Sequence, residues 1–264
     1  MQTKNENKNI KNIDLISTLK TIKNFEKKLL SAIESNYGSE QEEVRQHIVE
    51  IHPLLNQIDL QKFFDTYITA ETYPIDRLPR IISYLMDIKI QMYFLELDAG
   101  LYNRLIHMPY QGLDYKKNPR LLLCHLSLDQ SMIIKSRILW ERIMNFVYYL
   151  ETGRRLENVV NKNQSKKGVF WKAVNEDFSH WNFLKDYENF IEGFDNQLRT
   201  PEVHKNSTLR ARFLEDSVPD SAVLLTLQNI SMNIWQNVFS IVKGEEPQSK
   251  FWTIGQDAFK GEES

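Results

Sequence analysis

The chain contains only one cysteine, Cys124, so an intramolecular disulfide is excluded. Cys124 lies in the apolar run LLLCHL, and we expect it to be buried rather than to act as a reactive thiol. The sequence also lacks any run that approaches the ~18 consecutive apolar residues of a membrane span. The N-terminus, MQTKNENKNIKN, is polar and lacks the apolar segment of a secretory signal. These absences predict a soluble, cytoplasmic protein without a membrane partner.

Glycine and proline are scarce, with 9 and 8 among 264 residues. Few stretches alternate apolar and polar side chains in the two-residue period of a strand. Apolar residues instead recur at spacings of three and four, which is typical of amphipathic helices. The sequence therefore predicts an all-α fold.

The chain lacks an excess of either charge, because 33 basic and 35 acidic side chains leave a net charge of −2. Any affinity for nucleic acid must therefore come from a local patch. The sequence also lacks a Gly-rich phosphate loop, a C-x-x-C motif and a G-x-S-x-G motif. Nothing favours a dinucleotide-binding protein, a zinc finger or a serine hydrolase, and no cofactor is expected.

Turn-forming residues divide the chain into regions. The best linker is MPYQGLDYKKNPR, residues 108–120, which combines two prolines, a glycine and an Asn-Pro step. We expect it to precede a C-terminal helical bundle. The predicted order is a disordered segment at 1–12, an N-terminal helical region at 13–107, the linker at 108–120, the bundle at 121–244 and a polar tail at 245–264.

Several helix ends can be placed from the sequence. A first helix is expected from Ile13 to about Asn36, and Pro79 suits the first turn of a helix that reaches about His107. The last helix is expected between Ser221 and Gly244. Further helices are expected at about 121–153, 169–180, 182–198 and 201–213.

The helix at 121–153 is expected to be the longest. Apolar residues recur along one face of it, and Gly153 suits its C-terminal cap. The predicted buried residues of this face are Met132, Leu139, Ile143, Phe146 and Leu150.

The segment LRTPEVHKNSTLRAR, residues 198–212, carries the strongest chemical signal. Thr200 and Pro201 favour a helix start, which places Arg199 beside the helix N-terminus and His204 in its first turns. A helix N-terminus attracts anions, and its field together with Arg199 should keep His204 neutral as a base. An arginine can hold a phosphate bidentately while a histidine moves protons. The segment therefore suits a phosphodiester site that needs no metal.

An ordinary explanation also fits this segment. The spacing R-x4-H arises by chance in many chains, and a run of basic residues usually forms a solvated helix face. Under the functional interpretation, the basic residues that follow the motif would contact RNA. These candidate RNA-binding residues are Lys205, Arg210 and Arg212.

Residues 119–243 resemble a HEPN domain, a helical superfamily of RNases and toxin components. The resemblance rests on Arg199-Thr-Pro-Glu-Val-His204, which matches the R-x(4–6)-H signature, and on the segment SRILWERIMNFVYYLETG at 136–153. It implies a homodimer in which two motifs meet in one cleft. It further implies metal-independent RNA cleavage by 2′-OH attack, with Arg199 stabilising the phosphate and His204 as general base or acid. The setting implied is a toxin or phage-defence system, with an antitoxin or defence protein as partner.

Two positions depart from the usual HEPN pattern. Thr200 follows the arginine where Asn, Asp or His is common, and Asn206 replaces the tyrosine of toxins silenced by a nucleotidyltransferase partner. The second departure argues against that form of control. Two other hypotheses stay open: a non-catalytic helical RNA-binding or protein-interaction module, and a purely structural helical protein.

A polar stripe crosses the long helix, where Arg137, Glu141, Asn145 and Tyr148 recur at helical spacing. If the stripe faces the catalytic cleft, Glu141 would orient Arg199 or His204, and we include it among the candidate catalytic residues. The alternative is an exposed Arg137–Glu141 ion pair of small energetic value.

Two other groups of residues have simpler explanations. Glu43, His47, Glu50 and His52 lack the spacing of a metal motif, so no metal site is expected. A cluster of large aromatic residues could stack unpaired bases, but burial in the core or in a dimer interface is the better prediction. The cluster comprises Phe170, Trp171, Phe178, Trp181, Phe183, Tyr187 and Phe190.

Overall fold

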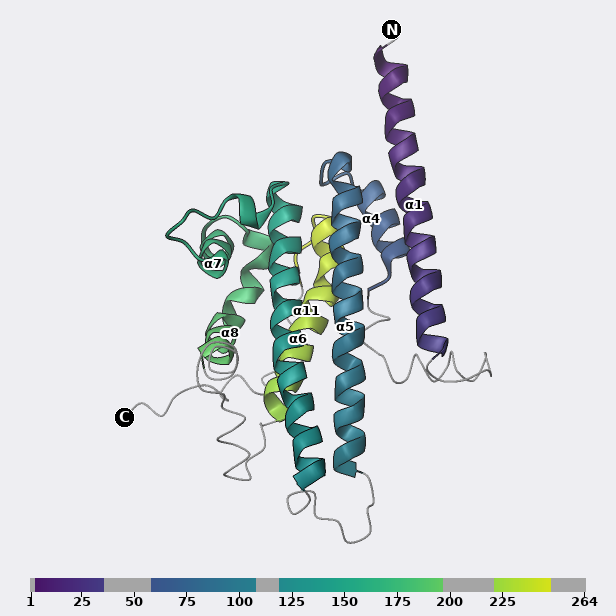
Figure 1. The fold of residues 1–264 in the computed structure, drawn as a ribbon. Coiled ribbons are helices and arrows are strands. Elements are labelled where there is room, and N and C mark those ends of the chain that lie inside the picture. The colour runs from purple at the N-terminus through teal and green to yellow at the C-terminus, as the bar shows by residue number, and fades with distance from the viewer. Residues whose placement is uncertain (1–2, 36–57, 108–118, 197–220, 248–264) are drawn as a thin grey trace. The chain divides into compact units, whose positions relative to one another are not determined.

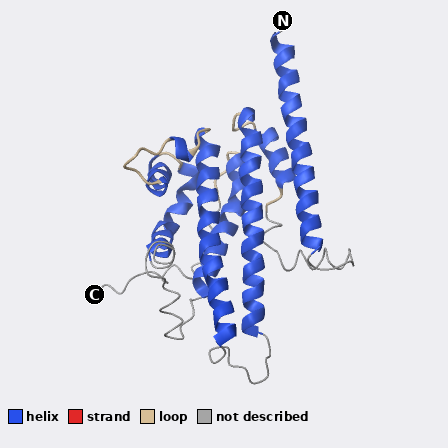
Figure 2. Ribbon diagram, viewed as in Figure 1, coloured by secondary structure: helices blue, strands red, loops and turns tan. Residues whose placement is uncertain are grey.

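The computed structural model describes residues 3–35, 58–107, 119–196 and 221–247. All regular structure in these ranges is helical (Figure 1, Figure 2), which confirms the predicted all-α fold. None of the helices in these ranges has both the length and the apolar composition needed to cross a membrane. The α-helices are α1 (Thr3–Ser35), α4 (Leu60–Ala70), α5 (Leu78–His107), α6 (Pro119–Thr152), α7 (Lys166–Glu176), α8 (Glu188–Phe194) and α11 (Ser221–Val242), and the 3-10 helices are η1 (Ile75–Arg77), η3 (Leu156–Asn158) and η4 (Ser179–Tyr187).

The chain forms two compact units. In the described ranges, the first unit contains α1, α4, η1, α5 up to Ile90, α6 from Arg142, η3 and α11 from Trp235. The second unit contains the rest of α5, α6 and α11, together with most of α7, η4 and α8. Both units thus draw on segments before and after the predicted linker, and the division into regions by that linker stays a prediction.

The first helix starts earlier than expected. α1 begins at Thr3 rather than Ile13, and it ends at Ser35, close to the predicted end. Residues 3–12 contain no glycine or proline, and their lysines and glutamate are good helix formers. Their polar composition suggested disorder, but it does not prevent the helix from continuing toward the N-terminus.

Local capping fixes the helices that follow. Asp59 caps α4, because its side chain accepts a 2.8 Å hydrogen bond from the backbone N–H of Lys62. Pro79 lies in the first turn of α5, which ends at His107 as predicted. Local sequence signals thus account for the starts of both helices.

The long helix α6 confirms its predicted buried face. Met132, Leu139, Ile143, Phe146 and Leu150 are all buried. The helix ends at Thr152, and Gly153 follows with a left-handed φ of 68° while its N–H donates to Tyr149 O at 2.8 Å.

Replacement of Gly153 by alanine is expected to destabilise the protein by about 1–2 kcal/mol through the left-handed backbone alone. A Cβ there would also lie 2.6 Å from Arg77 Nε. Arg77 would have to move, although its Nη1 donates to Leu150 O at 3.0 Å and so satisfies a carbonyl at the end of α6.

Urea unfolding followed by circular dichroism would measure this loss. Gly168→Ala is the matched control, because Gly168 lies inside α7 and has no left-handed φ. Its stability should change by less than about 1 kcal/mol. Equal effects of the two substitutions would contradict the explanation from backbone conformation.

Aromatic contacts form the centre of the first unit. The ring of Phe63 on α4 lies 6.4 Å from that of Phe146 on α6 and 6.3 Å from that of Phe239 on α11. Phe146 in turn lies 5.8 Å from Trp235. These contacts join segments that lie far apart in the sequence, so the unit depends on long-range packing.

The predicted aromatic cluster is buried, as all seven of its residues are part of the core; Phe170 belongs to the first unit and the other six to the second. The indole of Trp171 stacks on Trp140 with ring centroids 5.6 Å apart. The prediction of burial is therefore confirmed, and these rings are not free to stack RNA bases.

The single helix predicted at 182–198 was wrong. The chain instead forms the 3-10 helix η4 and then the short helix α8. A 3-10 helix has three residues per turn, so residues three apart share one side. Trp181, Leu184 and Tyr187 have this spacing, and all three are almost fully buried. Burial of this row is consistent with the three-residue period of the segment.

The predicted burial of Cys124 was also wrong. Cys124 is exposed on α6, and so is the neighbouring Leu123. The apolar composition of the run LLLCHL suggested burial, but a local run does not determine which side of a helix meets the core.

Candidate functional site

Glu141 is the only predicted site residue within the part of the chain that the structure describes. The predicted catalytic residues Arg199 and His204 lie outside it, as does the predicted helix at 201–213. The predicted RNA-binding residues Lys205, Arg210 and Arg212 lie outside it too, and so do Glu43, His47, Glu50 and His52. Their roles stay predictions.

Glu141 belongs to a charged cluster in the second unit, centred on Arg137. Arg137 Nη2 lies 3.4 Å from Glu141 Oε1, one turn along α6. Arg137 Nε lies 2.8 Å from Oδ1 of Asp195, the residue that follows α8. One guanidinium therefore contacts two carboxylates from different helices.

Burial makes the contacts of Arg137 unequal. The side chains of Arg137 and Asp195 are 12% and 9% exposed, whereas that of Glu141 is 43% exposed. Charges interact more strongly away from water, so Asp195 is the main partner of Arg137. The predicted Arg137–Glu141 pair does form, but the expectation that both partners would be exposed was wrong for Arg137.

Asp195 lies four positions before Arg199 in the sequence. Its ion pair with Arg137 fixes the end of α8 to α6, at the place where the chain continues toward the R-x4-H motif. Sequence reasoning missed Asp195, because no spacing rule connects it to Arg137.

The remaining residues of the polar stripe belong to the first unit. Asn145 is half-buried there, and Tyr148 is buried. The stripe predicted along α6 is thus divided between the two units, with Arg137 and Glu141 in the second.

No metal site is visible in the described ranges, since no three His, Cys, Asp or Glu side chains gather there. The Arg137 cluster offers charge pairing, with two carboxylates around one guanidinium.

A second buried charge pair links α5 and α6 in the second unit. Asp98 Oδ2 accepts a 2.6 Å hydrogen bond from Lys135 Nζ and another of 2.6 Å from Ser131 Oγ. Gln91 Nε2 donates to the backbone oxygen of Lys135 at 3.0 Å. These hydrogen bonds join side chains of α5 to α6, so the cluster stabilises the packing of the two helices.

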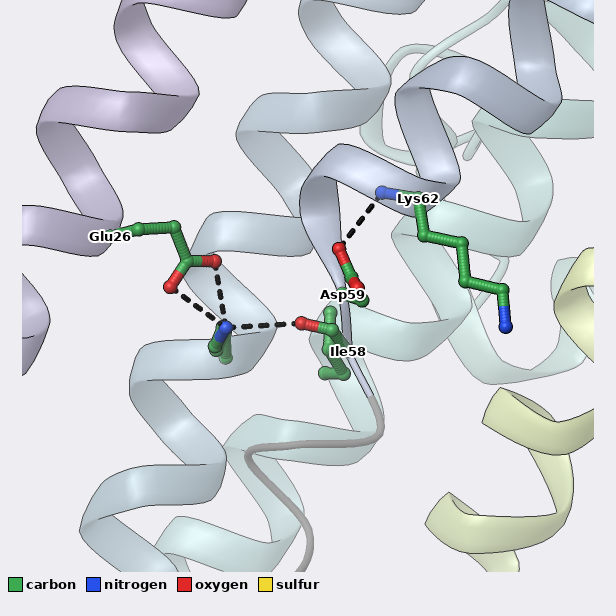
Figure 3. Close-up of polar contacts among 5 residues, drawn as sticks. Glu26, Ile58, Asp59 and Lys62 are labelled. Carbon is green, nitrogen blue, oxygen red and sulfur yellow. Dashed lines mark hydrogen bonds and ion pairs between the residues drawn. The ribbon is translucent and has the colours of Figure 1, made fainter. Parts of the chain in front are cut away.

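The corresponding link in the first unit joins α1 to α5 (Figure 3). Lys89 of α5 is buried, and its Nζ donates to Glu26 Oε1 at 2.7 Å and Oε2 at 2.9 Å. The same ammonium donates to the backbone oxygen of Ile58 at 3.1 Å. Lys89 thus holds α1 and the start of the α4 segment against α5. No spacing rule connects two residues 63 positions apart, so this pair could not be predicted from the sequence.

Glu26→Gln is expected to lower the free energy of unfolding by about 1.5–3 kcal/mol, the usual value of a hydrogen bond to a charged group. The reason is that the ammonium of Lys89 would stay buried without its carboxylate. Urea unfolding of wild type and variant would measure the difference. Glu176→Gln is the control, because Glu176 and its partner Lys172 are both exposed. Similar small losses in both variants would show that the Glu26–Lys89 pair stabilises the fold no more than an exposed ion pair does.

Two tyrosines of the first unit are held in their neutral form. Burial raises the pKa of Tyr73 well above its usual range, and Glu151, which accepts a 2.8 Å hydrogen bond from its hydroxyl, raises it further. Burial likewise raises the pKa of Tyr67, whose hydroxyl donates to Pro74 O at 2.9 Å. Neither phenol can therefore serve as an anionic nucleophile or base near neutral pH.

This chain matches no family model, no curated protein and no solved structure among those compared.

Proposed function

We propose that this protein is a metal-independent endoribonuclease of the HEPN type. The observation that carries the proposal is the pair Arg199 and His204 at R-x4-H spacing, next to the helix-start signal Thr200-Pro201. The all-helical architecture is compatible with it. The setting that we propose is a toxin or phage-defence system, with RNA as substrate and an antitoxin or defence protein as partner.

Ordinary acid–base chemistry accounts for the reaction. His204 takes the proton from a ribose 2′-OH, the 2′ oxygen attacks the adjacent phosphorus, and the bond to the 5′ oxygen breaks. The leaving oxygen receives a proton, which the second histidine of a homodimer can supply. Arg199 stabilises the negative charge on the phosphate. The products are a 2′,3′-cyclic phosphate and a 5′-hydroxyl.

The cluster on α6 supports the proposal by its place in the chain. The buried Arg137–Asp195 pair gives the segment before Arg199 a fixed starting point. Catalytic groups act efficiently only when neighbouring structure holds them within narrow limits. We assign Glu141 a positioning role through Arg137, its partner in the structure.

The test is an incubation of the wild-type protein with end-labelled tRNA and total RNA in EDTA. We expect cleavage that leaves cyclic-phosphate ends. Cleavage that requires added metal and leaves a 3′-hydroxyl would overturn the proposed chemistry. Salt-sensitive RNA binding by a folded dimer without cleavage, also with the RNA of stressed or infected cells, would instead favour the non-catalytic RNA-binding module.

A further inference from the structure

We infer that the outer face of α1 binds the phosphodiester backbone of a nucleic-acid strand. The lysine face, as we name it, consists of Lys20, Lys23, Lys27 and Lys28, all exposed. This inference does not depend on cleavage at Arg199 and His204. It assigns a role to the N-terminal region, for which the sequence alone suggested none.

The orientation of α1 places these lysines away from the protein. Thr18, Ile22 and Ile33 are buried and lie on one side of the helix. At about 100° per residue, Lys20 and Lys27 fall on the opposite side. Contacts with α4 and the Glu26–Lys89 ion pair hold the helix in this orientation.

The charge of this face is uncompensated within the described residues. Glu26 is the only acidic residue of α1 between Asp14 and Glu34, and Lys89 draws its carboxylate toward α5. None of the four lysines forms an ion pair with another described side chain. A chain with a net charge of −2 therefore presents a local face of four positive charges.

A linear polyanion fits the arrangement of these charges. Lys20, Lys23 and Lys27 span about 10 Å along the helix axis at 1.5 Å per residue. In a duplex each strand advances about 3.4 Å along the axis per phosphate, and a single strand is more extended, so two or three phosphates lie along this row. Lysine suits such contacts, because a flexible point charge follows the backbone without reading the bases.

A membrane surface fits less well. A helix that lies in a bilayer interface needs an apolar face beside its lysines. The apolar side of α1 packs against the protein instead, and the exposed large apolar residue in this part of the helix is Ile16. An acidic protein surface would supply charges, but not in a regular row.

The test measures binding of 5′-labelled single-stranded RNA and DNA of one sequence, in a His204→Ala background so that RNA is not cut. The variant carries Lys20→Gln, Lys23→Gln, Lys27→Gln and Lys28→Gln. The control replaces Lys162, Lys166, Lys172 and Lys243 by glutamine, which removes the same charge from other exposed positions.

Three or four lost contacts should reduce the slope of log K against log salt by about 2–3, since each phosphate contact contributes about 0.7 for a single strand. At 0.1 M salt this corresponds to a loss of about 10²–10³-fold in affinity. The control should retain most of its affinity. Equal losses in both variants, or wild-type affinity in the lysine-face variant, would overturn the inference. Binding of the wild type to phosphatidylserine vesicles but to neither oligonucleotide would overturn it too. Preference for RNA over DNA would identify the strand.

Discussion

An Asp195→Ala variant is expected to lose about 3–5 kcal/mol of unfolding free energy, because it leaves a buried guanidinium without its main carboxylate. Arg137 Nε lies 2.8 Å from Asp195 Oδ1, and both side chains are almost excluded from water. Glu141 stays nearby, but its distance of 3.4 Å and its exposure allow little compensation. Since domains are stable by only about 5–15 kcal/mol in total, this single change should be visible in any unfolding experiment.

Urea unfolding followed by far-UV circular dichroism would measure the loss. Glu141→Gln is the matched control, because it removes the exposed partner of the same arginine, and we expect it to cost at most about 0.5 kcal/mol. The double variant Arg137→Met, Asp195→Leu should recover much of the stability, since an apolar pair of similar size replaces a buried ion pair at little cost. A loss below about 1 kcal/mol for Asp195→Ala would contradict the buried-pair interpretation.

The helices could be predicted from the sequence because their signals are local. The apolar face of α6 and the left-handed Gly153 at its end were both readable from residue spacing and type. Pro79 likewise marked the first turn of α5. Each of these features depends on residues within a few turns of one another.

The ion pairs could not be predicted, because they join distant positions. Lys89 and Glu26 are 63 residues apart, and nothing in either segment of the sequence distinguishes them from the exposed charges around them. For Arg137 the sequence predicts only Glu141 as a partner, because helical spacing reveals pairs within one helix and not the carboxylate that another segment supplies. The predicted burial of Cys124 was wrong for the same reason, because packing between helices decides which apolar residues are covered.

For the candidate site, the sequence predicts which chemical groups are present but not how they are arranged in space. The R-x4-H motif specifies groups that can hold a phosphate and move a proton, while the structure adds a fixed point at Asp195 on the approach to it. The lysine face of α1 became recognisable only when Glu26 was found to be turned toward Lys89. In the sequence alone, Glu26 lies among these lysines, and nothing there indicates that its carboxylate pairs with another helix.

Removal of the histidine is the change with the largest expected effect on activity. If the protein is a HEPN-type endoribonuclease, His204→Ala should reduce RNA cleavage by at least about 10²-fold, the usual scale for loss of a general acid–base group. Arg199→Ala should reduce it comparably by loss of charge stabilisation on the phosphate. Because the two groups serve one transition state, the double variant should be little worse than either single variant.

Single-turnover cleavage of labelled tRNA in EDTA would measure these effects, and His180→Ala is the matched control. His180 lies in η4, away from the motif in sequence, so its replacement should leave the cleavage rate near that of the wild type. The lysine-face variant separates binding from chemistry, since its weaker cleavage should be restored at saturating protein, whereas that of His204→Ala should not. A His204→Ala protein that cleaves at the wild-type rate would exclude the motif as the catalytic site.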